Sequence, residues 1–208
     1  VSGGKAPLGG NIYLGGNSTG SNAVFTATGG TIEKGNSAQG ANIAINYPTA
    51  TVNLGGVTVH NTKASAANIL VESGVLNIGE GAAITNEAAG AANILSSSVA
   101  GTVSRITMTG GTVSGGTNSN VRLLPGDSFT MSGGLLTGGS AGRGGNIYAE
   151  AAVMLTGGTV EKGTTTENNT GANIRLNNGN ARLVLDGVTV PGGIHANSTA
   201  TVTLKNNV

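Results

Sequence analysis

The sequence lacks the residues on which many catalytic and cross-linked proteins depend. It has no cysteine, which excludes disulfides and thiolate metal sites. It has no tryptophan, two phenylalanines and three tyrosines, so an ordinary core of large aromatic side chains is excluded. The net charge is +1, which provides no basic surface for nucleic acid. No apolar run approaches the roughly 18 residues of a membrane span, so we expect none.

Helical periodicity is also missing. No window keeps apolar residues at positions i, i+3, i+4 and i+7. The apolar residues are mostly aliphatic and many are β-branched, which favours strands. Low net charge and sufficient aliphatic content argue against disorder. The chain opens at Val1 without a signal-peptide pattern, so we expect a mature or excised segment.

What is present is a repeat of about 26 residues, marked by asparagine before isoleucine or valine. A fixed period of this kind predicts stacked repeats. A second marker, a glycine pair, recurs in phase with the first, and a degenerate copy of the first occurs at Gly193-Ile194. The asparagines of the first marker are Asn11, Asn42, Asn68, Asn93, Asn120, Asn146 and Asn173.

Each repeat reads as three short strands, as in residues 40–61. Runs of alternating apolar residues bounded by Gly and Asn are typical of half-buried strands. The sequence therefore predicts an all-β fold: a right-handed parallel β-helix of about eight coils and roughly 35–40 Å. We expect one domain over residues 1–208, with a surface loop at 15–22 in the longer first coil.

The repeated asparagine has a structural explanation. Stacked Asn side chains can hydrogen-bond from coil to coil, and Asn tolerates the left-handed backbone of a sharp corner. Glycine serves the other corner without a side chain. The sequence therefore predicts a structural ladder formed by the seven asparagines of the first marker.

The segments GGTIEKGNSAQGANIAI, GGTVSGGTNSNVRLLPG and GGTVEKGTTTENNTGANIRL resemble repeats of right-handed parallel β-helix proteins of the pectin-lyase-like superfold. They are most similar to the non-enzymatic repeats of bacterial surface and autotransporter-passenger-like proteins. The resemblance covers the whole chain. It implies an extracellular or cell-surface protein.

Enzymes of this superfold cleave polysaccharides with clustered aspartates, which can hold calcium, and a basic residue. Here the only aspartates, Asp127 and Asp186, are about two coils apart, and the matched Glu33 and Glu161 are several coils apart. Paired carboxylates for glycoside hydrolysis must lie roughly 5–10 Å apart. We therefore expect no catalytic residue, no metal site and no cofactor.

The outward row of the first strand is the best candidate contact face. Tyrosine and arginine are frequent in binding hot spots, so this row could contact a glycan or a neighbouring chain. The alternative is that β-propensity alone selects Leu and Tyr on an exposed sheet. The candidate residues are Tyr13, Leu70, Leu95, Arg122, Tyr148 and Arg175, with Ala44 in the same row.

Three weaker signals remain. His60 and His195 have no acid in register and read as solvated residues. Sequons at Asn17, Asn168 and Asn197 are expected by chance in so Asn-rich a chain. An ice-binding face would need a regular threonine column. The column after the glycine corner reads Thr31, Val57, Ala82, Thr112, Leu135, Thr159 and Val188, which is broken.

Neither end of the chain resembles a cap. The first ten residues are too short and Gly-rich for a capping helix, and residues 199–208 read as one more strand. Uncovered strand edges invite pairing, either with flanking coils of a longer chain or with another copy. We expect a non-catalytic extracellular rod or filament with adhesive side faces. The alternatives are a carbohydrate-active or glycan-binding β-helix and, less favoured, an ice-binding solenoid.

Overall fold

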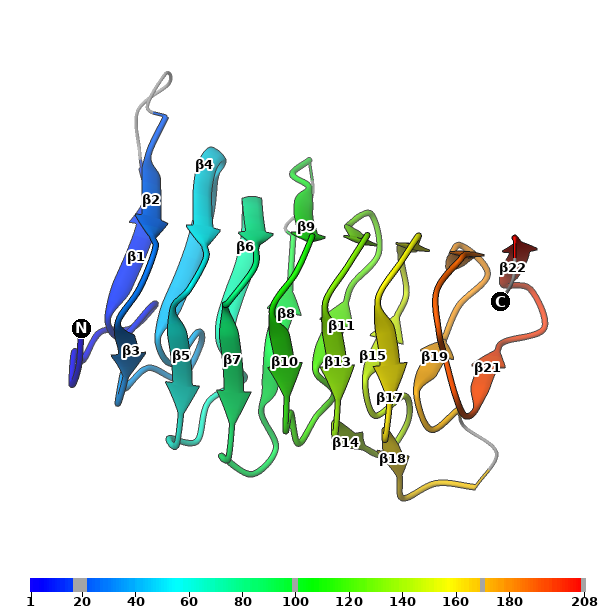
Figure 1. Cartoon of the computed structure of the whole chain (residues 1–208). Coiled ribbons are helices and arrows are strands. Elements are labelled where there is room, and N and C mark those ends of the chain that lie inside the picture. Colours follow the sequence, from blue (N-terminus) through cyan, green and yellow to red (C-terminus); the bar gives the residue numbers. More distant parts are fainter. Residues whose placement is uncertain (17–21, 99–100, 169–170, 207–208) are drawn as a thin grey trace.

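The computed structural model shows a parallel β-helix (Figure 1). It describes residues 1–16, 22–98, 101–168 and 171–206, and these contain strands and turns but no helix. The coils stack from the N-terminal end to the C-terminal end, and every strand pairing within them is parallel. The predicted fold class is therefore confirmed. Most of the predicted loop at 15–22 lies outside the described residues.

Two of the three strand files belong to one 14-stranded sheet, because two long strands bend from one file into the next. The first-strand file holds β1 (Ile12–Gly15), the first half of β4 (Ile43–Leu54), the first half of β6 (Ala67–Ile78), β8 (Ala92–Ser96), β11 (Val121–Leu123), β15 (Ile147–Ala149), β19 (Ile174–Leu176) and β21 (Ile194–Ala196). The second-strand file holds β2 (Val24–Ala27), the second halves of β4 and β6, β9 (Ser104–Met108), β12 (Ser128–Met131), β16 (Ala152–Leu155), β20 (Arg182–Asp186) and β22 (Thr201–Lys205).

The third-strand file forms a separate six-stranded sheet. It consists of β3 (Thr31–Glu33), β5 (Thr58–Asn61), β7 (Ala83–Asn86), β10 (Thr112–Ser114), β13 (Leu135–Thr137) and β17 (Thr159–Glu161). A two-stranded sheet of β14 (Ser140–Ala141) and β18 (Thr164–Thr165) lies outside these files.

The number of complete turns is about six rather than the predicted eight. Eight strands stack in each of the first two files, but the third has only six. In the seventh coil, residues 188–190 make a single bridge, Thr159 to Thr189, instead of a strand. Pro191 follows directly and cannot donate a backbone hydrogen bond, so the pairing does not extend.

The core is one aliphatic file running the length of the described coils. Ile43 pairs with Ile69 and Ile69 with Ile94, and all three are fully buried. The inward positions of the second file continue the same core, with Phe129 as its one fully buried aromatic residue among those described. Stacking identical positions buries each coil against its neighbours, as the repeat predicted.

The column of residues after the glycine corner differs from the predicted column by one position in three coils. Val57, Ala82 and Val188 turn inward and are buried, so the corner holds one more residue there before the strand begins. A one-residue slip exchanges the two faces of a strand. The outward column therefore reads Thr31, Thr58, Ala83, Thr112, Leu135, Thr159 and Thr189.

Candidate contact sites on the lateral faces

The asparagines before the first-strand file form a ladder through the coils. Each step is a hydrogen bond from the Nδ2 of one asparagine to the Oδ1 of the next. Five steps are present: Asn11 to Asn42 at 2.7 Å, Asn42 to Asn68 at 2.8 Å, Asn93 to Asn120 at 2.9 Å, Asn120 to Asn146 at 2.7 Å and Asn146 to Asn173 at 2.7 Å. The side chains from Asn42 onward are almost fully buried, so the ladder satisfies polar groups that water cannot reach.

The ladder is interrupted between Asn68 and Asn93. Elsewhere the Asn Oδ1 also accepts a backbone N–H from a preceding glycine, as from Gly35 to Asn42 at 3.0 Å. In these two coils the equivalent position is asparagine, and strands β5 and β7 continue through it. Asn61 donates to Asn86 at 2.9 Å, and the buried Asn93 Oδ1 has no partner in the described residues. The hydrogen bond between Asn61 and Asn86 thus replaces the missing ladder step between Asn68 and Asn93.

The predicted contact row is not uniformly exposed. Tyr13 is 51% exposed, but Leu70 is 1% exposed and Arg175 only 9%. The turn that closes each coil lies against the outward residue of the next. Gly40 comes so close that an added Cβ would lie 3.0 Å from the Leu70 Cβ. Leu70 therefore cannot contribute to an exposed contact face, and the same is true of Ala44, which is fully buried.

A second, partly exposed part of the row centres on Tyr148. The guanidinium of Arg122 lies over its ring, 4.7 Å from the centroid, and donates to Asn118 Oδ1 at 3.0 Å. The Tyr148 hydroxyl donates to Glu150 Oε1 at 3.1 Å, and Asn177 donates to the same oxygen at 2.8 Å. Partial burial, and then the bond to Glu150, raise the pKa of the Tyr148 hydroxyl above its ordinary value. Tyr148 therefore acts as a neutral donor.

A pocket of about 260 Å³ opens beside Tyr148. Its wall includes Arg122 and the loop between β14 and β15, which carries Arg143. Arg143 pairs through Nε with Glu167 Oε2 at 2.5 Å. The repeat pattern did not predict Arg143 and Glu167 as site residues, because both lie in loop segments outside the 26-residue pattern. The β14–β18 pairing and a hydrogen bond from Glu167 N to the Gly142 carbonyl at 3.2 Å bring these two loops together.

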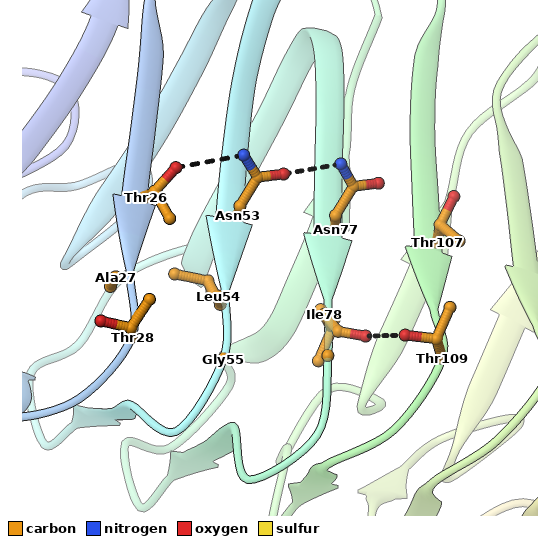
Figure 2. A pocket seen from close by; sticks show the side chains of 11 residues that line it. Thr26, Ala27, Thr28, Asn53, Leu54, Gly55, Asn77, Ile78, Thr107 and Thr109 are labelled. Carbon is orange, nitrogen blue, oxygen red and sulfur yellow. Dashed lines mark hydrogen bonds between the residues drawn. The ribbon is translucent and has the colours of Figure 1, made fainter.

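A second hollow, of about 310 Å³, lies on the outer face of the second-strand file (Figure 2). Gly55 and Gly79 interrupt a row that begins with Thr28 and ends with Thr109, so backbone forms the floor. Beside this row, Asn53 donates to Thr26 at 3.2 Å and Asn77 donates to Asn53 at 2.8 Å. The residues that line the hollow are uncharged. They combine hydroxyl, amide and backbone groups with apolar side chains such as Leu54 and Ile78, and the exposed lining is mostly apolar.

One prediction about the histidines was wrong. His60 does have an acid in register, because it pairs directly with Glu33. Its Nδ1 lies 2.8 Å from Thr85 Oγ1, which ties the ring to the next coil. Glu33 instead forms an exposed ion pair with Lys34, with Nζ and Oε1 3.3 Å apart, and Glu161 pairs identically with Lys162. These repeated pairs lie on the solvent-facing surface.

Of the remaining acidic and glycosylation candidates, Asp127 and Asn197 form hydrogen bonds within the fold. Asp127 is buried and accepts the Ser104 N–H at 2.8 Å, so it orders a turn. Asn197 donates from Nδ2 to the Asn177 carbonyl at 2.9 Å, which engages its amide. Asn168 is exposed, whereas Asn17 lies outside the described residues.

The described part of the chain has neither a cluster of metal-binding side chains nor a membrane-spanning helix. Its His, Asp and Glu side chains form no group of three that could hold a metal ion. It also has no helix with the length and hydrophobicity needed to cross a membrane.

Comparison with protein-family models, with curated proteins and with solved structures finds no match to this chain.

Proposed function

We propose that this chain is a non-catalytic structural β-helix that serves as a stiff rod at a bacterial cell surface. The observation on which this depends is the continuity of its axial contacts. The aliphatic core, the backbone ladders and most of the asparagine ladder all run along the stacking direction. Bending or stretching such a body must disturb many hydrogen bonds at once. The similarity of its repeats to surface and autotransporter-passenger-like repeats supports the extracellular location.

The exposed core residues of the two end coils favour a partner that is itself made of β-helical coils. At the C-terminal end, the inward-facing Val202 and Leu204 are 39% and 65% exposed. At the N-terminal end, Ile12 and Phe25 are only partly buried. Exposed core residues beside an open sheet edge favour the addition of another coil. We propose that further β-helical coils cover them, from flanking chain or from a second copy stacked end to end.

Electron microscopy of the purified chain tests this proposal. We expect straight filaments with an axial repeat of about 40 Å, the length of the eight strands that stack in the first-strand file. Isolated short rods would contradict end-to-end assembly of copies and leave flanking coils as the cover. Irregular or flexible particles would contradict the rod itself.

A second candidate function is glycan binding on a lateral face, with or without polysaccharide cleavage. The pocket beside Tyr148, whose lining includes Asn118, Arg122 and Arg143, favours it. A glycan-binding screen together with a lyase assay tests this candidate. Ice binding is a lesser candidate, favoured by the threonine column in the third-strand file, where five of seven positions are threonine. A thermal hysteresis measurement tests it.

A further inference from the structure

Arg175 is a buried cation without a counter-charge. Its side chain is on the outward row of β19, yet it is only 9% exposed. Its Nε is buried without a hydrogen-bond partner, and no ion pair involves it within the described residues. Only the Nε of this guanidinium is a buried donor without a partner, and a buried donor costs stability while it stays unsatisfied.

The surroundings of Arg175 contain two more arginines. Tyr148 is its register neighbour, and Arg122 lies on the other side of Tyr148. The third, Arg143, is next to Gly144, whose backbone lies against the stem of Arg175: an added Cβ there would be 2.8 Å from the Arg175 Cβ. Strands β11 and β19 and the loop before β15 thus bring three arginines around one tyrosine.

Only two carboxylates in the described chain lie near these three arginines, and both already accept hydrogen bonds from neighbouring side chains. Glu167 pairs with Arg143, and Glu150 accepts from Tyr148 and Asn177. Three positive charges therefore face two negative ones. Arg122 uses one of its five N–H donors on Asn118, and no protein acceptor in the described chain takes the others. The cluster retains both an excess positive charge and free donors.

We infer that the pocket beside Tyr148 binds a tetrahedral oxyanion of the phosphate or sulfate type, free or as an ester on a sugar. Arg122 and Arg143 donate to the anion from the pocket wall. Arg175 does not line the pocket; it lies beneath the neighbouring loop and adds a positive charge behind the pocket wall. A carboxylate offers oxygens in one plane and suits a single guanidinium. A tetrahedral oxyanion presents oxygens in several directions and suits donors from separate elements.

Titration calorimetry of the chain with sodium phosphate and sodium sulfate, at constant ionic strength in chloride, tests this inference. We expect saturable binding at one site. Arg122→Gln and Arg143→Gln should each weaken it about tenfold, because each removes a charge-assisted hydrogen bond. Arg182→Gln is the matched control, since it removes the same charge from an exposed position on β20 and should leave binding unchanged.

The direction in which a second substitution changes affinity separates binding at a specific site from general attraction of anions to a positive surface. Glu167→Gln removes the carboxylate that competes for Arg143, so it should tighten oxyanion binding. A sugar sulfate such as glucose 6-sulfate identifies the source: tighter binding than inorganic sulfate indicates an ester ligand, and equal binding indicates the free ion. Absence of saturation with all three anions, or equal weakening by Arg182→Gln, would overturn the inference. The rod proposal is tested separately by electron microscopy, so neither binding result affects it.

Discussion

At the residue scale, buried amides are the most specific stabilising groups in this protein. Asn120 shows the complete pattern. Its Oδ1 accepts from Gly116 N and from Asn93 Nδ2, both at 2.9 Å. Its Nδ2 donates to the Thr137 carbonyl at 2.9 Å and to Asn146 Oδ1 at 2.7 Å. One side chain therefore connects three coils and two strand files.

Asn120→Ala should destabilise the fold strongly. The substitution leaves several buried polar groups without partners, at about 1–3 kcal/mol for each unsatisfied group. We expect the unfolding midpoint in urea, followed by circular dichroism, to fall clearly. Asn53→Ala is the control, because its ladder bonds lie on the outer face, where water can replace them. Equal losses for the two variants would contradict a special role for the buried ladder.

The ionised Glu72 side chain lowers the free energy of unfolding at neutral pH. Its Oε2 is buried without a hydrogen-bond partner in the described residues, and burial raises the pKa of its carboxyl above 4.5. A carboxyl with a raised folded pKa holds its proton more tightly in the folded state. Stability therefore falls as pH rises from the ordinary glutamate range through the folded pKa.

Glu72→Gln should raise the free energy of unfolding near neutral pH. The gain should disappear below about pH 4, where the glutamate is protonated in both states. Urea unfolding at a series of pH values measures this difference. The exposed Glu80→Gln serves as the control. A gain from Glu72→Gln that is constant with pH would exclude the electrostatic explanation.

At the element scale, the strands are too short to be stable alone, and the corners determine how closely they stack. Gly111 shows the constraint at a corner. Its φ is 77°, and an added Cβ would lie 2.6 Å from the Ala82 carbonyl oxygen of the preceding coil. The absence of a side chain there allows one coil's corner to rest on the next.

Gly111→Ala should destabilise the fold more than Gly126→Ala. Both glycines have positive φ, so both variants carry the roughly 1–2 kcal/mol cost of left-handed backbone. A Cβ added at Gly111 would meet the backbone of the preceding coil, whereas a Cβ added at Gly126 would have nothing within 4 Å. The difference between the two unfolding free energies therefore reports the contact between coils. Equal values would show that the corners are not in tight contact.

At the scale of the whole molecule, the rod has two different kinds of surface. Its sides are sheets whose strands are already paired (Figure 1), whereas its C-terminal coil exposes the core residues Val202 and Leu204. Association through the ends continues the parallel sheets, and association through the sides does not. The proposed filament therefore depends on the end coils alone.

Substitution of lysine for both Val202 and Leu204 should abolish end-to-end assembly. A charged residue at an inward position of the end coil would be buried in the seam and repel an added coil. Sedimentation velocity should show only the single-chain species, with the circular dichroism spectrum preserved. Met154→Lys is the matched control, since Met154 is 43% exposed but lies on a side face. Assembly that survives the end substitution would indicate lateral association instead.

The sequence by itself determined the coil. The 26-residue period places equivalent residues one above another, so the inward files and the Asn ladder follow from alternation and spacing alone. Even the interrupted step is visible in the sequence, where Asn61 and Asn86 replace glycine seven residues before the ladder asparagine.

Only the tertiary structure decided which outward residues reach solvent and which meet. Leu70 is buried because the turn at Gly40 folds over it, and the threonine column continues through Thr58 and Thr189 because the corner holds one more residue in those coils. Arg143 and Glu167 meet through two loops that do not repeat. A period fixes neighbours along the axis, but the path of a turn depends on contacts with the next coil, which no pattern within one repeat contains.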